Sequence, residues 1–592
     1  MIPEEIEVAP TPRPGVGRDL MRGAELGAWL AMLIAFPIAA FVMGAALGLL
    51  PFVGKASLDL GLLKLLGRGL GWCASEVFLF ALLGALFRAG FGLIARRVRR
   101  PTGEPLRSPR RFRAWVWVAG LVVFGLATGC ATAVWIMRRA EAELASATAE
   151  TDRIDPDWRL DDLLAAREVI PEDEDGAIAV AKVAAELPGG WPPPPDPDGP
   201  DVRVAYDRAV ATDPARRLDD ETVDALFADL DARGETLEAA WWIADYDRGR
   251  HEFTLGRALI DTQLEETYRA LDVARLLRAD VLIAAHDGHL DDALGSCAAV
   301  LGVAQSIGDE PFANGQFVRI AIDHMAVDAV VRILAQGEPS DEALGSLQDL
   351  LDDERGRPRI LYALRGERAM FVELVRRVAS RELPVSAITD SNGREMVFPS
   401  LHQIVGTATV VSGRYQMAVA LKWMNESIAI LDRPQSEWVV SARDWRARLR
   451  AAVNSRVAPF TSALPLLLAP PLDMYLTTEL RGRAEMAAAT ILIAAERHRR
   501  AMGFWPAAIG EISSDILPTP APSDPFSGER FRMEHVDGRL RVYSVGPNLK
   551  DEHGTFDAKT WRDGAADDLG VFALDPDLRG GPREDAEGRK VE

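Results

Sequence analysis

Cysteine and histidine are scarce in this chain of 592 residues, which has three cysteines and eight histidines. Cys73 and Cys130 lie inside apolar runs, so Cys297 is alone in the polar part and no disulfide can form there. The closely spaced pair in His286-Asp287-Gly288-His289 lies on a predicted helix turn without a nearby third ligand. The signatures Gly-x-Ser-x-Gly, Cys-x-x-Cys and His-Glu-x-x-His are absent, as is a Gly-rich phosphate loop. We therefore predict no catalytic residues and no cofactor from motifs.

Charge is divided unevenly along the chain. Residues 1–139 hold 17 basic and 8 acidic residues, a net charge of +9, whereas residues 140–592 hold 50 basic and 80 acidic residues, a net charge of −30. A strongly acidic surface repels phosphate groups, so the large polar part is not expected to bind nucleic acid.

Long apolar runs occur only near the N-terminus. Three of them, at about 26–50, 69–87 and 114–137, have the length and composition typical of membrane helices. The loop Arg96–Arg113 contains eight arginines and one acid, which predicts that it lies on the cytoplasmic side. We therefore expect a three-helix anchor over 26–139 in a bacterial cytoplasmic membrane, with a disordered tail (1–25) inside and the large C-terminal domain outside. The expected partners are the lipid bilayer and a protein of the envelope.

The region after the anchor has helical periodicity and very little strand-like alternation. One helix is expected at about Gly256–Ala285, and Ser340 is expected to cap the start of another. Trp241-Trp242 lie at helical spacing, and we expect them to line the core or a groove. We divide it into an outer helical segment (140–187), a Pro-rich linker (188–201) and a helical repeat-like domain (202–475). An antiparallel helix pair that turns at Asp287-Gly288 is similar to a tetratricopeptide unit, although no strict repeat period emerges. Stacked helices of this kind offer concave surfaces for partner proteins.

The C-terminal part combines one long helix with strand-like runs, over 476–575. The runs Arg530–Glu534 and Leu540–Val545 flank Asp537-Gly538, a dipeptide that favours a tight hairpin, and Gly570–Leu574 is a third run. Residues 576–592 are rich in Gly, Asp and Arg, and we expect them to be disordered. The predicted fold class is thus mainly α: three transmembrane helices, an outer helical region and a small C-terminal α+β module.

The motifs of this module resemble those of a known family. Gly503-Phe504-Trp505-Pro506, Asp524-Pro525-Phe526-Ser527-Gly528 and Tyr543-Ser544-Val545-Gly546-Pro547-Asn548 are similar to the globular half of the type II secretion major pseudopilin. The whole chain more closely resembles uncharacterised bacterial multi-pass membrane proteins that end in such a block. The resemblance implies a calcium site at Asp551, Asp567 and Asp568. Asn548-Leu549 stands where the family usually has Asp-Gly, which departs from the calcium-binding pattern.

Three functions are compatible with these observations. The leading hypothesis is a membrane-anchored, extracytoplasmic scaffold or protein-binding protein without catalysis. An envelope hydrolase that uses carboxylates of the helical domain is one alternative, because acid pairs such as Asp291-Asp292 and Asp352-Asp353 are abundant. An accessory component of a secretion or pilus-like assembly is the other.

Overall fold

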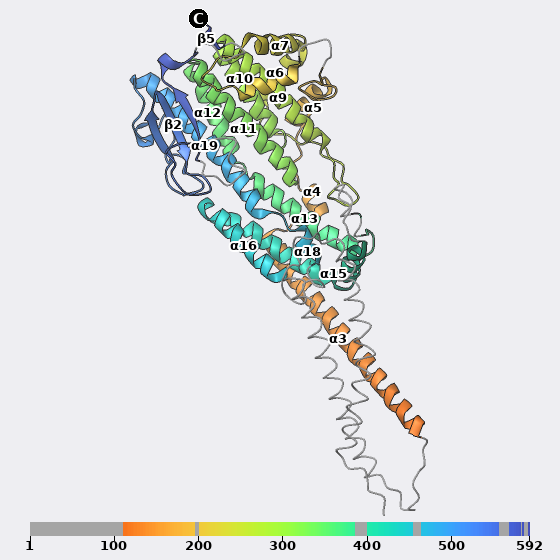
Figure 1. The fold of residues 1–592 in the computed structure, drawn as a ribbon. Helices are drawn as coiled ribbons and strands as arrows, with labels where there is room; N and C mark the ends of the chain where they lie inside the picture. Colours follow the sequence, from red (N-terminus) through yellow and green to blue (C-terminus); the bar gives the residue numbers. More distant parts are fainter. Residues whose placement is uncertain are drawn as a thin grey trace, which may run out of the picture. The chain divides into compact units, whose positions relative to one another are not determined.

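A computed structural model describes residues 110–195, 201–384, 387, 399–453, 463–555, 568–581, 583–584 and 590–591. The chain divides into two compact units, Met1–Ala131 and Thr132–Glu592. In the first unit the described structure is the beginning of helix α3 (Arg110–Ile154). The second unit contains the end of α3 and every other described element (Figure 1).

The structure contradicts the predicted membrane anchor. The first two predicted spans, at 26–50 and 69–87, lie outside the described residues. The third, at 114–137, belongs to α3, which does not end with the apolar run but continues through Arg138 and Arg139 to Ile154. None of the helices in the described part of the chain is both long enough and apolar enough to cross a bilayer. This finding contradicts the predictions of three transmembrane helices, of a multi-pass topology and of a membrane localisation, which were inferred from the apolar runs and from the arginine-rich loop.

Helices of 8 to 31 residues dominate the described part of the second unit, and shorter helical turns lie in the connections between them. The principal helices are α5 (Gly176–Ala185), α6 (Val202–Ala211), α7 (Asp220–Asp231), α8 (Gly234–Trp241), α9 (Glu265–Asp287), α10 (Leu290–Gln305), α11 (Ala313–Gln336), α12 (Asp341–Gly356), α13 (Arg359–Ala379), α15 (Pro399–Ile428), α16 (Trp438–Val453) and α19 (Leu472–Met502). The shorter helices are α4 (Leu160–Ala165), α18 (Ala463–Leu468), and the 3-10 turns η2 (Trp242–Asp245), η3 (Ala429–Asp432), η4 (Gln435–Glu437), η5 (Ile509–Glu511) and η7 (Pro576–Leu578).

Local sequence signals set many of these boundaries. The Asp219 and Ser340 side chains accept hydrogen bonds from backbone N–H groups at the starts of α7 and α12. Gly288 and Gly503 adopt left-handed conformations, with φ of 82° and 85°, at the ends of α9 and α19. The antiparallel pair predicted at Asp287-Gly288 therefore forms, with α9 and α10 side by side (Figure 1).

One predicted helix begins later than its periodicity indicated. The pattern predicted a helix from Gly256, but α9 begins at Glu265. Leu259 has a positive φ of 63°, and the Asp261 carboxylate accepts the Ala258 N–H, so these residues form a turn before the helix. An isolated bridge between Thr254 and Gln263 closes the same loop.

Part of the Pro-rich segment belongs to the core. Trp191 is 1% exposed, packs edge-on against Tyr206, and donates its indole N–H to Asp229. Burial of so large an aromatic side chain contributes roughly 3 kcal/mol or more of hydrophobic stabilisation. Residues 188–195 are thus attached to α6 and α7 through this indole.

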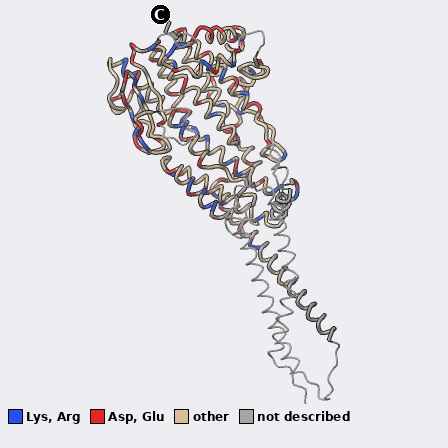
Figure 2. The backbone as a smooth tube through the Cα atoms, in the orientation of Figure 1, with Lys and Arg blue, Asp and Glu red and all other residues tan. Residues whose placement is uncertain are grey.

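Acidic and basic positions are interspersed along the helices (Figure 2), and several pair across the interior. Arg319 donates from Nε and Nη2 to the two carboxylate oxygens of Glu354, both at 2.6 Å. Arg359 pairs with Asp323 and lies 3.3 Å from Glu479. All five side chains are at most 3% exposed, so α11, α12, α13 and α19 meet around a buried ionic network.

The small sheet packs against α19. Its three strands, β1 (Arg532–Val536), β2 (Arg539–Ser544) and β3 (Leu569–Leu574), are antiparallel in the order β1-β2-β3. The predicted hairpin forms at Asp537-Gly538, whose φ values of 54° and 71° belong to a tight turn with two positive φ angles. Strands β2 and β3 contribute Leu540, Val542 and Val571 to the main core.

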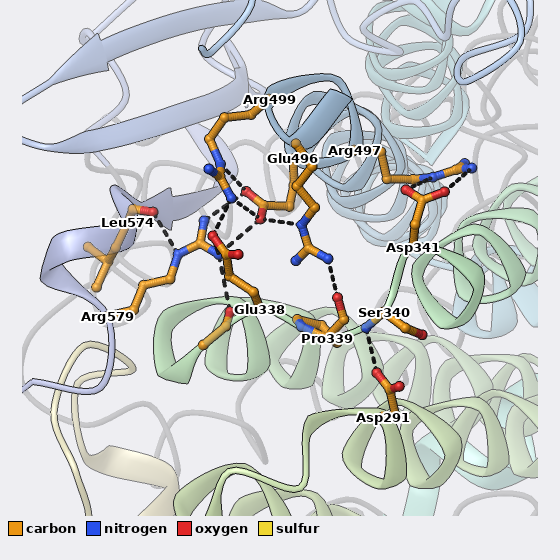
Figure 3. Close-up of polar contacts among 12 residues, drawn as sticks. Asp291, Glu338, Pro339, Ser340, Asp341, Glu496, Arg497, Arg499, Leu574 and Arg579 are labelled. Carbon is orange, nitrogen blue, oxygen red and sulfur yellow. Dashed lines mark hydrogen bonds and ion pairs between the residues drawn. The ribbon is translucent and has the colours of Figure 1, made fainter. Parts of the chain in front are cut away.

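The C-terminal segment is partly ordered, where the sequence predicted disorder. Residues Pro576–Leu578 form η7, and Arg583–Glu584 (β4) pairs with Lys590–Val591 (β5). Arg579 donates to both oxygens of the buried carboxylate of Glu496 on α19, and also to the carbonyls of Leu574 and Gly337 (Figure 3). This arginine connects the strand region to the helices.

Candidate cation site in the loop after β2

Strand alternation places Glu534 and Tyr543 on the same face of the hairpin. Arg532 pairs with Tyr543 and Glu534 with Arg541, so these four side chains share one side of the two strands. The Tyr543 hydroxyl lies 2.8 Å from Glu534 Oε1 and 3.1 Å from Asp551 Oδ1, and donates its proton to this pair of carboxylates. Proximity to the carboxylates and burial both raise the pKa of Tyr543, with burial as the larger cause.

His553 completes a group of three metal-ligand side chains. Its Nδ1 lies 3.6 Å from Glu534 Oε1 and 4.0 Å from Asp551 Oδ1. The ligand atoms of the three residues all lie within 4.8 Å of one another. The loop reverses sharply here, because Leu549 and His553 have positive φ angles. The group is partly open to solvent, and the His553 side chain is 81% exposed.

Asp568 lies beneath the same loop and is fully buried. Its Oδ2 accepts the backbone N–H groups of Glu552, at 3.1 Å, and Gly554, at 2.8 Å. Its Oδ1 and the Glu552 Oε2 are buried and have no hydrogen-bond partner within the described part of the chain. Burial, followed by the negative charges of Glu552 and Asp551, raises the pKa of Asp568 to about 6.

Two of the three predicted calcium ligands therefore meet at one loop. Asp568 accepts backbone N–H groups of Glu552 and Gly554, and Asp551 accepts that of His553, whereas Asp567 lies outside the described residues. Oxygen donors and a buried carboxylate oxygen without a partner fit a divalent cation, since calcium binds mainly carboxylate and carbonyl oxygens. Calcium at Asp551, Asp567 and Asp568 remains a prediction.

Sequence reasoning missed Glu534 and His553 as members of this group. The hairpin prediction contained the necessary signal for Glu534, because a two-residue turn at Asp537-Gly538 fixes which residues of the two strands face the same side. His553 could not be found in this way, because its position depends on the path of the loop.

A second polar cluster brings together serine, histidine and glutamate. His251 Nε2 lies 3.0 Å from Ser306 Oγ, and His251 Nδ1 lies 3.8 Å from Glu266 Oε2. These residue types form the nucleophile, base and orienting acid of many hydrolases. Here Ser306 is fully buried, and its hydroxyl donates to the Val303 carbonyl. The hydroxyl is therefore hydrogen-bonded inside the protein and does not face solvent.

A solvent-facing pocket of about 430 Å³ lies where the loop before α5 meets η2. Its lining combines two aromatic residues with four acids, namely Trp242, Tyr246, Asp173, Glu174, Asp245 and Asp247. The sequence predicted Trp241-Trp242 as core or groove lining; in the structure Trp242 is 64% exposed and Trp241 44% exposed. Arg248 pairs with Glu174 and with Glu168, and its Nε lies 3.9 Å from Asp247 Oδ1, so it offsets part of the negative charge of the lining.

Comparisons with protein-family models, with curated proteins and with solved structures found no match to this chain.

Proposed function

We propose that this chain is a scaffold or protein-binding protein without catalysis, and that a basic segment of its partner docks at the pocket around Trp242. The supporting observation is the exposed indole of Trp242 beside Asp173, Asp245 and Asp247. Lysine and arginine side chains bind favourably over indole faces and pair with carboxylates. Exposed tryptophan is also enriched among the residues that dominate protein–protein binding energy.

The acids of the helical domain favour binding over the hydrolase alternative. In the pairs singled out from the sequence, Asp291 accepts the backbone N–H of Ser340, while Asp352 and Asp353 pair with Arg355 and Arg357. The buried acids Asp323, Glu354 and Glu479 are paired with arginines as described above. Acids that are engaged in this way support the fold and are not free for acid–base chemistry.

Peptide binding tests the proposal. An octapeptide that alternates lysine and glycine should bind to the full chain in fluorescence anisotropy, and the affinity should fall as salt is added, since the contact is largely ionic. Trp242→Ala and the double variant Asp245→Asn/Asp247→Asn should each weaken binding at least about tenfold. The matched controls are Phe504→Ala, which removes another exposed aromatic residue (57% exposed), and Asp349→Asn, which removes an exposed acid of α12.

Two results would contradict the proposal. One is equal affinity for the lysine peptide and for a glutamate peptide of the same length. The other is a loss of affinity in the Phe504 and Asp349 variants as large as that in the Trp242 variant, because the contact would then not be at this pocket.

An accessory role in a secretion or pilus-like assembly is the second candidate. It is favoured by the order of elements at the C-terminus, where the 31-residue helix α19 is followed by an antiparallel three-stranded sheet that packs on it. Crosslinking followed by identification of the captured proteins tests this role, and complexes without any pilin-like or secretin component would count against it.

A further inference from the structure

Four carboxylates gather around the loop after β2. They belong to Glu534 on β1, to Asp551 and Glu552 in the loop and to Asp568, and two arginines, Arg532 and Arg541, contact the same loop. Arg532 lies 3.5 Å from Asp551 Oδ2, and Arg541 donates to the His553 carbonyl. Asp551 Oδ1, on the side of His553, has the Tyr543 hydroxyl and the His553 N–H as its hydrogen-bond donors.

We infer that Glu534, Asp551 and His553 form a binding site for a divalent transition-metal ion of the zinc type, with the buried carboxylate of Asp568 supporting the loop that holds them. This site differs from the calcium site that the pseudopilin resemblance implies, since two of its three ligands are Glu534 and His553. It is also independent of the partner-binding pocket at Trp242.

The donor set selects the class of ion. Neutral imidazole nitrogen is a common ligand of zinc and related ions, whereas calcium and magnesium prefer oxygen alone. Bonds of about 2.0–2.1 Å place the ligand atoms of a tetrahedral zinc ion roughly 3.3 Å apart. The spacings of 3.6 Å and 4.0 Å from His553 Nδ1 to the two carboxylates are longer than this, and the three ligand atoms all lie within 4.8 Å of one another, so the group must contract around the ion. Three protein ligands also leave a fourth position open to water or to a partner's side chain.

Supporting contacts surround the three ligands. The Tyr543 hydroxyl contacts both Glu534 and Asp551, and such hydrogen bonds orient carboxylate ligands and fix their spacing. Asp568 holds the N–H groups on either side of His553 through Oδ2, while its buried Oδ1 has no partner within the described chain. A buried carboxylate of this kind is stabilised by a nearby positive charge, which the metal ion supplies.

Metal titration of the full chain tests the inference. Competition with a chromophoric chelator should give one zinc ion bound per chain, and cobalt should give the visible absorption bands typical of four-coordinate nitrogen and oxygen ligation. His553→Ala and Glu534→Gln should each weaken zinc binding at least about tenfold. His535→Ala is the matched control, because this histidine lies on the opposite face of β1 and pairs with Asp575. Its zinc affinity should stay within about twofold of that of the unchanged chain.

Circular dichroism separates the loss of a metal ligand from the loss of folded structure. Circular dichroism should show that His553→Ala remains folded, since the side chain is largely exposed. Zinc affinity that is unchanged in His553→Ala would overturn the inference, as would a chain that binds calcium but not zinc, or neither ion. Partner binding at the Trp242 pocket would be unaffected by these outcomes.

Discussion

Arg579 and Glu496 form a two-bonded ion pair in the protein interior, with Nη1–Oε1 and Nη2–Oε2 distances of 3.0 Å and 2.7 Å. Arg499 and Arg500, from the same helix as Glu496, donate to the same carboxylate (Figure 3). These hydrogen bonds and positive charges outweigh the effect of burial and lower the pKa of Glu496 to about 2. The pair therefore stays ionised at pH values well above 2, and connects the C-terminal segment to α19.

Replacing Arg579 should lower the free energy of unfolding. In Arg579→Ala the Glu496 carboxylate loses two of its hydrogen bonds while it remains buried, and breaking a buried ion pair costs about 3–5 kcal/mol. Urea denaturation should show this loss of unfolding free energy, and hydrogen exchange should increase in β2 and β3. Arg497→Ala is the control, since Arg497 pairs with Asp341, which is 61% exposed, and should cost less than about 1 kcal/mol. Equal losses in the two variants would contradict the interpretation.

The stability of the metal-free protein should depend on Asp568 in the weakly acidic range. The pKa of Asp568 is raised to about 6 in the folded protein, above the value of about 3.9 for an unfolded chain. The folded state thus favours the protonated acid, and the stability that this group provides is complete below about pH 4 and lost as the pH rises through 6. Denaturation of the wild type and of Asp568→Asn should therefore give curves of stability against pH that diverge between pH 4 and 6. Parallel curves would show that this carboxylate does not titrate there.

Sequence reasoning succeeded where the structure depends on neighbouring residues. Caps such as Ser340 and Gly288, and the hairpin turn at Asp537-Gly538, act over a few residues and can be read from the chain. The same reasoning misjudged the start of α9, because the apolar spacing after Gly256 continues through a turn that Asp261 stabilises.

Contacts between residues far apart in the sequence could not be predicted from the sequence. Arg579 meets Glu496 across 83 residues, and it belongs to a segment whose composition indicated disorder. Apolar composition likewise predicted a membrane span inside α3, although composition does not indicate where a helix ends. Of the residues around the proposed cation site, Asp551 and Asp568 were expected from the pseudopilin resemblance, whereas Glu534 and His553 required the register of the strands and the path of the loop.

Helix packing predicts a sharp contrast between two glycines. A Cβ atom added at Gly366 on α13 would lie 1.7 Å from the Pro311 carbonyl oxygen, whereas one added at Gly295 on α10 would have no atom within 4 Å. Gly366→Ala should therefore force the backbones apart and cost about 1–3 kcal/mol or more. Gly295→Ala should raise stability by about 0.5–1 kcal/mol, because alanine favours the helix. Thermal unfolding of the two variants measures this difference, and a gain in both would contradict the close approach.

Cys297 should be unreactive in the folded protein. Its side chain is fully buried on α10, its Sγ lies 3.4 Å from the Ala326 carbonyl oxygen, and burial raises its pKa to about 12. Because the thiolate is the reactive form, a buried thiol reacts only when the surrounding helices open. In a chain with Cys73→Ser and Cys130→Ser, a thiol reagent at pH 8 should modify Cys297 at least about a thousandfold more slowly than in urea. Adding Ser346→Cys, at an exposed position of α12, supplies a fast-reacting control in the same molecule. If Cys297 reacted as fast as that control, the side chain would not be buried between the helices as described, since burial is what excludes the reagent.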